Sequence, residues 1–470
     1  MSRLRVIQNN EEQILEFSGS VLLRDFLAQH GYFVPHPCGG KGTCKKCEVI
    51  VNGETVLACK HIIFVDATVI LPEREVISTV TGGKESGHLT EKVCLCLDIG
   101  TTTLALGLVS LDEKCIIRTV TAPNPQRAFG ADVISRIDYC TKHGVGDLQE
   151  ILMQCIRGMV KELLDCFHLA GVERMYVAGN TTMLHLFFGV DCASLGVSPY
   201  TPAFLEKRCV NALDLGIQGV GQVISLPGIS AFVGADIVAG IHFVDLPENN
   251  AYRILLDLGT NAEVALCSKD KILCSAAAAG PCFEGANISC GMSASNGAIC
   301  AYSADDGCTV IGGGAAKGVC ATGLIDVIAE GIRRGWIDET GYLKEDVLPI
   351  CDGVSLTRKD IREFQLAKSA IRAAIECLLH RAGVDFTDVE GLYVAGGFSA
   401  GINVGNAAFL GLIPPKLEGK FRGINNASLL GTLKYACSDG DAPVRLENAE
   451  YVDLSTDALF SQLFVEYMMF

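Results

Sequence analysis

Four cysteines near the amino terminus have the type and spacing to surround one metal centre. The first three lie within ten residues, with gaps of five and then two residues between them, and the fourth follows after eleven more: Cys38, Cys44, Cys47 and Cys59. The glycines between the first two allow tight turns and expose backbone N–H groups to the sulfides of a cluster. This spacing favours a [2Fe–2S] cluster and indicates an electron carrier.

Two alternatives to the cluster use the same cysteines. A structural zinc site also takes four thiolates, but such sites usually combine two Cys-x-x-Cys units, and here only Cys44 and Cys47 form one. Buried thiols without a ligand are the other alternative. The close spacing in a glycine-rich segment favours iron and sulfide over both.

Two glycine turns far apart in the chain have nearly the same sequence. They are Asp98-Ile99-Gly100-Thr101-Thr102-Thr103 and Asp257-Leu258-Gly259-Thr260-Asn261, each at the end of an apolar run. The glycines let the backbone approach a phosphate, and the Thr and Asn side chains donate hydrogen bonds. Asp98 and Asp257 are expected to hold hydrated Mg²⁺ or to orient the attacking water. One such turn is a weak signal, but two at corresponding positions, each after a buried strand, predict a duplicated phosphate clamp.

The elements that must position these residues are predicted from periodicity. An apolar strand leads into a glycine turn four times, at 93–103, 175–182, 254–261 and 392–397. Amphipathic helices are predicted between them, including 151–169 and 361–379. The fold class is therefore α/β over 93–470.

The first 75 residues are expected to form a separate small domain around the cysteines. Strands are predicted over 4–7, 47–51 and 68–71, a helix over 21–30, and a hairpin turn at Asn52-Gly53. The polar segment 76–92 then reads as a linker.

The large unit resembles the actin/Hsp70/sugar-kinase ATPases. Asp98–Thr103 matches the first phosphate loop of that superfamily, Asp257–Glu263 the second, and 394–398, with Gly396 and Gly397, its adenosine-contacting turn. Glu263 and Glu284, near the second clamp, are expected either to bind Mg²⁺ through water or to cap helices.

Together with the cysteines, the chain resembles the reductive activators of corrinoid-dependent proteins. The more specific segments are 130–137, 179–183, 280–286 and 365–371. The resemblance implies a β-grasp [2Fe–2S] ferredoxin domain, an ATPase domain with ATP and Mg²⁺ between two lobes of about 93–250 and 251–470, and ATP-dependent transfer of one electron that reduces inactive cobalt(II) to cobalt(I). Implied partners are a corrinoid protein of a methyltransferase system and a low-potential electron donor. Longer members carry a further domain after the cluster segment, where this chain has only 76–92, so a homodimer is left open.

Composition narrows the function classes. The formal charge of −16 disfavours nucleic acid and anionic membranes as partners, and the first residues lack a signal peptide's apolar run. The 22 cysteines argue against a disulfide framework and for the reducing cytoplasm of an anaerobic cell. Two other functions are open at this stage: an ATP-driven electron donor to another metalloenzyme, such as an iron–sulfur dehydratase, and a non-enzymatic nucleotide-binding redox sensor.

Overall fold

The fold is described from a computed structural model of the chain. The structure describes residues 2–8, 11–30, 32, 34, 47–71, 85–259, 261–351, 353–397, 399–438 and 446–470. Three of the predicted site residues, Cys38, Cys44 and Thr260, lie outside the described residues, so their roles stay predictions.

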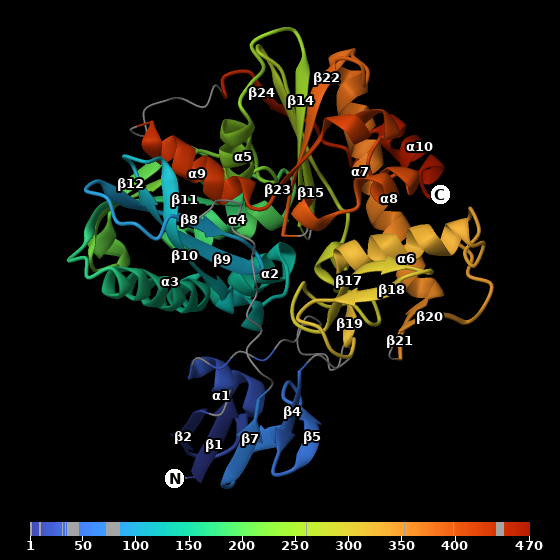
Figure 1. The fold of residues 1–470 in the computed structure, drawn as a ribbon. Helices are drawn as coiled ribbons and strands as arrows, with labels where there is room; N and C mark the ends of the chain where they lie inside the picture. Colours follow the sequence, from blue (N-terminus) through green and yellow to red (C-terminus); the bar gives the residue numbers. More distant parts are fainter. Residues whose placement is uncertain are drawn as a thin grey trace.

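The amino-terminal part forms a five-stranded mixed sheet of order β2-β1-β7-β4-β5, drawn in blue below the rest of the molecule in Figure 1. β1 runs parallel to β7, and the other neighbours are antiparallel. The strands are β1 (Ser2–Gln8), β2 (Glu11–Phe17), β4 (Glu48–Val51), β5 (Glu54–Leu57) and β7 (Ala67–Ile70), and a short pair is formed by β3 (Val21–Leu22) and β6 (Ile62–Ile63).

Local sequence explains most of this sheet. Alternate residues such as Leu4 and Val6 point into a core that helix α1 (Leu23–Gln29) completes from one side. Asn52 and Gly53, with φ of 50° and 89°, form the predicted turn between β4 and β5. The predicted strands and helix are confirmed within a few residues, whereas β2 was missed because its polar residues alternate with few apolar ones.

The first lobe is built on a six-stranded sheet of order β10-β9-β8-β11-β13-β12. Its strands are β8 (Val93–Ile99), β9 (Thr103–Ser110), β10 (Cys115–Pro123), β11 (Val172–Gly179), β12 (Arg208–Asn211) and β13 (Val220–Ser225). Helices α2 (Val133–His143), α3 (Gly146–Cys166) and α4 (Thr181–Phe188) accompany it. The central strands are continuously apolar because helices cover both faces of the sheet (Figure 1).

The second lobe repeats this sheet with the order β23-β22-β14-β15-β16-β24. Its strands are β14 (Tyr252–Leu258), β15 (Ala262–Cys267), β16 (Ile272–Ala277), β22 (Val389–Ala395), β23 (Phe421–Ile424) and β24 (Ala449–Tyr451). In each lobe the strand that precedes a phosphate loop pairs with an antiparallel hairpin partner on one side and a parallel strand on the other. The duplicated turns are thus part of a duplicated α/β lobe, and the predicted fold class is confirmed.

Two helices lie between the sheets and join the lobes. α5 (Ala235–Val244) packs on β11 of the first lobe and on β14 and β15 of the second, while α9 (Ala427–Cys437) packs on β8 and β11. They also pack against each other so closely that a Cβ at Gly431 would lie 1.8 Å from the carbonyl oxygen of Ala239. Glycine is required at that crossing, because any side chain would separate the two helices.

The remaining elements belong to the second lobe. A smaller sheet of β17 (Ala298–Ser303), β18 (Gly307–Val310) and β19 (Gly318–Val319) packs on α6 (Ala321–Arg333), and β20 (Val347–Cys351) pairs with β21 (Val354–Thr357). The other helices are α7 (Arg358–Ala382), α8 (Val404–Phe409) and α10 (Ala458–Glu466). One disulfide among the described residues, Cys308–Cys351, joins β18 to β20 and was not predicted.

Both predicted helices are present, and one of the segments that resemble the family lies on the second of them. The expected helices 151–169 and 361–379 are α3 and α7, and α7 ends at Gly383 with a φ of 70°. The family-like segment 365–371 lies on α7, where the buried Nζ of Lys368 donates to the carbonyl oxygens of Tyr467 and Met469, both at 2.6 Å. Its role is to hold the last residues against the lobe.

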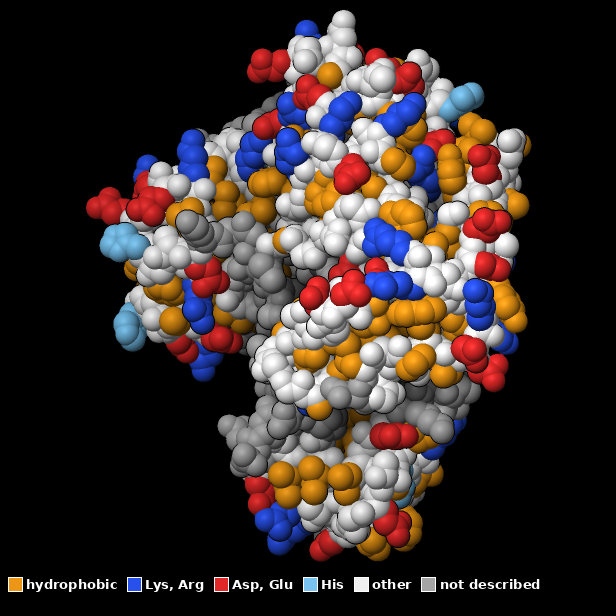
Figure 2. Space-filling model, turned by 45° about the vertical axis from the view of Figure 1, so that its right-hand side comes forward, with side chains coloured by type: hydrophobic (Ala, Val, Ile, Leu, Met, Phe, Trp, Pro, Cys, Tyr) orange, Lys and Arg blue, Asp and Glu red, His pale blue; other side chains and the backbone are white. Residues whose placement is uncertain are grey.

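The described surface agrees with the charge of the chain. On the face shown in Figure 2, Lys and Arg side chains are scattered among Asp and Glu, and a recess separates the two lobes. Among the described residues, none of the helices has the length and apolar character needed to cross a bilayer.

Candidate functional site

Both predicted phosphate loops are tight β-hairpin turns at the facing edges of the two lobes. The first joins β8 to β9, and the Gly100 N–H donates to the Thr103 carbonyl at 3.0 Å. The second joins β14 to β15, and the Gly259 N–H donates to the Asn261 carbonyl at the same distance. Both loops are therefore closed by the N–H of their glycine, but the first is one residue longer than the second.

Each loop is also seated on a glycine of the neighbouring parallel strand. A Cβ at Gly179, which ends β11, would lie 2.9 Å from the Ile99 carbonyl oxygen, and a Cβ at Gly396, which follows β22, would lie 2.5 Å from that of Leu258. Gly396 has a φ of 118°, which a residue with a side chain rarely adopts, and Gly397 beside it is exposed. The predicted adenosine-contacting turn is thus the counterpart, in the second lobe, of the turn after β11.

Asp98, at the end of β8, is held by the amino-terminal end of α9. Its Oδ1 accepts from the Ser428 hydroxyl at 2.7 Å, and its Oδ2 accepts from Asn426 Nδ2 at 2.9 Å. Burial raises the pKa of Asp98, and these two donors oppose the rise. Both oxygens of this carboxylate therefore already have protein partners.

Asp257, the equivalent residue of β14, has a different environment. Among the described residues it has no hydrogen-bond donor, and burial together with the charges of Asp98 and Glu284 raises its pKa to about 7. Asp236, in the first turn of α5, is in turn raised to a pKa of about 7 by burial and by the charge of Asp257. The fold thus brings together a carboxylate pair, Asp236 and Asp257.

Sequence reasoning missed Asp236. The signal that could have found it is its position directly after Gly234-Ala235 at a helix start, because a buried aspartate in the first turn of an apolar helix needs a reason to be there.

Two glutamates complete the acidic group in the cleft. Glu263 lies in β15, so the helix-cap interpretation is wrong for it, and its pKa is raised well above the usual range by burial and by Asp236 and Asp257. Glu284, at the end of the 3₁₀ turn η4 (Pro281–Glu284), accepts a hydrogen bond from the Thr102 hydroxyl at 3.3 Å. That bond links the first phosphate loop to the second lobe.

This acidic group fits a hydrated divalent cation. Mutual repulsion raises the pKa values of its members, and a bound cation would relieve it. Among the described residues, no three His, Cys, Asp or Glu side chains converge as direct ligands of one ion. Mg²⁺ usually keeps several of its waters and binds through few carboxylates, so a water-mediated Mg²⁺ bound to nucleotide phosphate is the species that these residues suit.

The thiols of the predicted cluster site that are described lie together. Cys47 and Cys59 are buried, and their sulfur atoms are 3.2 Å apart. The short segment before Cys59 therefore brings this cysteine to Cys47, as the prediction requires. Two buried thiols in contact at one end of a small sheet suit thiolate ligation of one metal centre.

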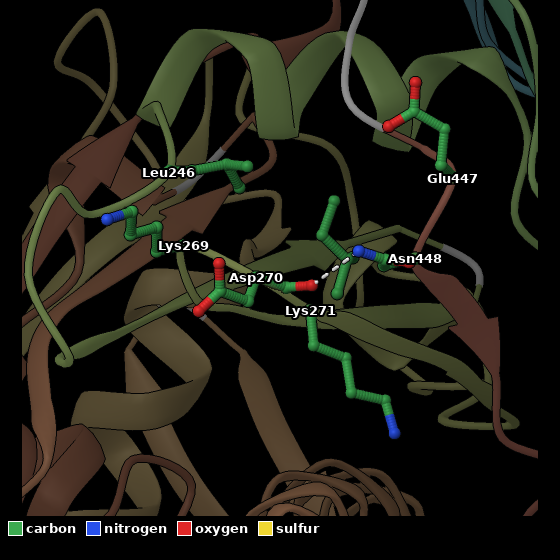
Figure 3. A pocket seen from close by; sticks show the side chains of 7 residues that line it. Leu246, Lys269, Asp270, Lys271, Glu447 and Asn448 are labelled. Carbon is green, nitrogen blue, oxygen red and sulfur yellow. Dashed lines mark hydrogen bonds between the residues drawn. The ribbon is translucent and has the colours of Figure 1, made fainter.

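A separate small pocket, of about 210 Å³, lies away from all of these residues (Figure 3). It is formed by the turn between β15 and β16 and the segment before β24 and is lined mainly by polar side chains, among them Lys269, Lys271 and Glu447. The two lysine side chains point in different directions, and Asn448 donates to the Asp270 carbonyl at 3.0 Å. None of the predicted site residues lines this pocket.

Comparison with known proteins gives concordant matches over most of the chain. Residues 93–249 match a family model described as the RACo middle region, and residues 251–470 match one described as the C-terminal domain of RACo, the ASKHA domain. The "middle region" coincides with the lobe built on β8–β13 and is no separate insertion.

Individual relatives agree with these models. The chain is 30% identical to "Corrinoid activation enzyme RamQ" of Eubacterium limosum over 419 residues, covering 80% of this chain and 70% of that protein. It is 30% identical to the "[Co(II) methylated amine-specific corrinoid protein] reductase" of Methanosarcina barkeri over 366 residues, covering 68% of this chain and 65% of that protein. A solved structure titled "Reductive activator for corrinoid,iron-sulfur protein" superposes with a TM-score of 0.70 and 25% identity, covering 99% and 98% of the two chains.

Proposed function

The chain belongs to the RACo family of reductive activators, and we propose that it uses ATP to drive the reduction of a corrinoid protein's cobalt(II) to cobalt(I). The observation that carries the ATP-dependent part is the pair of similar phosphate loops after β8 and β14, whose aspartates, Asp98 and Asp257, lie close enough to each other and to Asp236 to interact electrostatically. The expected resemblance to this family is confirmed.

The cleft residues have distinct roles in this proposal. The loop N–H groups and the Thr101, Thr102 and Asn261 side chains bind phosphate oxygens, and Gly396 and Gly397 lie against the nucleoside. Asp257 and Asp98 hold the waters of Mg²⁺, and Asp236 orients the attacking water and accepts its proton. Glu284 keeps Thr102 in place until nucleotide binds.

The amino-terminal domain is the electron-transfer part. Cys38, Cys44, Cys47 and Cys59 would hold a [2Fe–2S] cluster, which supplies one electron when reduced by a low-potential donor. The contact between Cys47 and Cys59 supports this ligand set.

Coupling to ATP would help to meet the free-energy cost of reducing cobalt(II). For one electron, 59 mV corresponds to about 1.4 kcal/mol, so a potential gap of about 200 mV costs about 5 kcal/mol. Binding the cobalt(II) form of the partner preferentially and changing its coordination would close that gap. ATP binding and hydrolysis would then close and open the lobes and release the partner, because a ligand shifts a conformational equilibrium only through unequal affinity for the two states.

The test is ATP-dependent formation of cobalt(I), followed optically in a corrinoid protein from the same organism with a low-potential donor present. We expect repeated turnovers of cobalt(II) reduction with ATP. With a non-hydrolysable analogue we expect at most a single turnover. Asp257→Asn should still accept an electron from a chemical reductant but lose corrinoid reduction. Corrinoid reduction that is equally fast without ATP would overturn the proposal, and ATP hydrolysis stimulated instead by an iron–sulfur dehydratase would identify another acceptor.

The cluster is tested separately. Protein prepared without oxygen should contain two irons per chain, and Cys47→Ala or Cys59→Ala should abolish its visible spectrum. Cys166→Ala, at an exposed cysteine on the first lobe, is the control and should leave the spectrum unchanged. Zinc in place of iron would refute electron transfer by this domain.

A further inference from the structure

The carbonyl groups of the first phosphate loop are all turned to one side and bonded there. The Gly100 carbonyl accepts from Asn124 Nδ2 at 2.8 Å, and the Thr102 carbonyl accepts from the backbone N–H of the same Asn124 at 2.8 Å. Between them, the Thr101 carbonyl accepts from Nη2 of Arg136 at 2.6 Å. Two residues outside the loop thus fix three successive peptide groups, two of them through side chains and one through a backbone N–H.

That orientation decides where the loop N–H groups point. In a trans peptide the N–H is opposite to the carbonyl, so the N–H groups of Thr101 and Thr102 point away from Asn124 and Arg136. Among the described residues, neither N–H has an acceptor, and both residues are only half-buried. Successive free N–H groups at an accessible turn form a concave site for an anion.

Arg136 is an unusual residue to find at this place. Its side chain is fully buried on α2, and its other donors reach neutral acceptors: the Gly130 carbonyl at 3.0 Å, Gln126 Oε1 at 3.3 Å and Met183 Sδ at 3.1 Å. No carboxylate among the described residues lies within ion-pair distance of it. Burial lowers its pKa to about 9 and Arg127 adds to this, while the charge of Asp132 opposes it. A buried cation without a direct ion pair is costly unless an anion compensates it.

The Thr101 side chain is held from the other direction. Asn180, the cap of α4, donates from Nδ2 to the Thr101 hydroxyl oxygen at 3.0 Å, while its Oδ1 accepts from the Met183 N–H at 2.9 Å. Because the hydroxyl oxygen already accepts a bond, its hydrogen remains to be donated to a ligand. The arrangement therefore presents donors to an anion.

We propose that Arg136 and Asn124 are positioning residues for the nucleotide phosphates: they hold the acceptor oxygens of the first loop away from the site, and the guanidinium supplies the positive charge that a polyphosphate compensates. The inference rests on the proposed ATP site and adds its recognition of phosphate. It also gives a reason why segment 130–137 resembles the family: the segment contains Arg136, which lies behind the loop and holds it in place.

The test compares a ligand with phosphates and one without. ATP and adenosine affinities are measured by calorimetry on the full chain for wild type, Arg136→Met and Arg136→Lys. We expect Arg136→Met to bind ATP about 10- to 100-fold more weakly with adenosine affinity unchanged, since one charge-assisted hydrogen bond and the charge are lost. Arg136→Lys should recover part of the ATP affinity, because it keeps the charge but not the planar fork.

Two further variants separate positioning from folding. Arg372→Met removes another buried arginine, which is paired with Glu376 in the second lobe, and should leave the ratio of ATP to adenosine affinity at the wild-type value. Asn124→Ser keeps an oxygen near the Gln126 N–H but is too short to reach the Gly100 carbonyl, so it should weaken ATP binding by a smaller factor.

The outcomes distinguish this inference from the proposed function. Equal losses of ATP and adenosine affinity in the Arg136 variants, or unchanged ATP affinity in them and in Asn124→Ser, would overturn the positioning role while the ATP site stands. Failure of wild type itself to bind ATP would overturn both.

Discussion

The two phosphate loops have nearly the same sequence and each closes a β-hairpin, but the fold gives their aspartates opposite surroundings. Asp98 meets the amino-terminal end of α9, where Asn426 and Ser428 donate to both of its oxygens. Asp257 lies near the amino-terminal end of α5, which presents another carboxylate, Asp236. The helices α5 and α9 follow equivalent strands of the two lobes, so the comparison is between matched positions.

This difference shows how a duplicated fold divides its tasks. A carboxylate with two protein donors is compensated without a ligand and can hold the lobes in register. Asp236 accepts from the Ile237 N–H at 2.9 Å, but Asp257 has no donor among the described residues, so it is stable only when protonated or when a cation lies beside it. The aspartate of the first loop is thus fastened to the protein, and that of the second is left to be compensated by a cation.

The largest expected effect tests whether the two aspartates really differ. Asp257→Asn should lower the rate of ATP hydrolysis by several hundredfold, because it removes a charge that orients the metal and its water. Asp98→Asn should lower it by only about tenfold, since part of its role is to accept bonds from α9. Phosphate release at saturating ATP measures both, and equal losses would contradict the comparison.

A second prediction concerns Asp236. Asp236→Asn should lower kcat by about 100-fold with little change in ATP affinity, as expected of a residue that orients water or accepts its proton. Asp245→Asn is a matched control at the other end of the same helix, where the aspartate pairs with Lys434. A large change in ATP affinity with kcat retained would assign Asp236 to nucleotide binding instead.

A third prediction uses the pH dependence of stability without metal or nucleotide. The pKa of Asp257 is raised from 3.8 to about 7 in the folded chain, so its contribution is present below pH 4 and is lost as the pH rises to about 7. In the presence of a chelator, wild type should therefore lose about 3 kcal/mol, or about 3 °C in melting temperature, relative to Asp257→Asn between pH 5 and pH 8. A constant difference between the two melting temperatures across that range would argue against a raised pKa of Asp257.

The smallest expected effect concerns the donors to Asp98. Ser428→Ala should destabilise the chain by about 1 kcal/mol and lower hydrolysis only a few-fold, because it removes one buried hydrogen bond between the lobes. Thr432→Ala removes a hydroxyl of the same helix that bonds only to the Ser428 carbonyl, and it should leave hydrolysis unchanged. Hydrolysis that falls equally in both variants would mean that α9 acts through its packing and not through Asp98.

Local patterns in the sequence were sufficient for the parts of the site that lie next to each other in the chain. A glycine turn after an apolar strand dictates a hairpin that can approach phosphate, so both loops were predicted, and the turn at Asn52-Gly53 was predicted because few residue pairs tolerate positive φ. The spacing of the four cysteines predicts a cluster site before any fold is known, and the family resemblance, recognised from several motifs, adds the expected function.

What the sequence could not show is which distant side chains meet these loops. Asp236, Ser428 and Arg136 are separated from the loops they serve by long stretches of chain, and each lies in a segment that reads as an ordinary amphipathic or apolar helix. Their roles arise because parallel sheets place successive strand ends at one edge and because α5 and α9 cross between the lobes. The sequence alone thus determined the loops and their ligands, while tertiary packing decided that one aspartate is neutralised by donors and the other faces a second carboxylate.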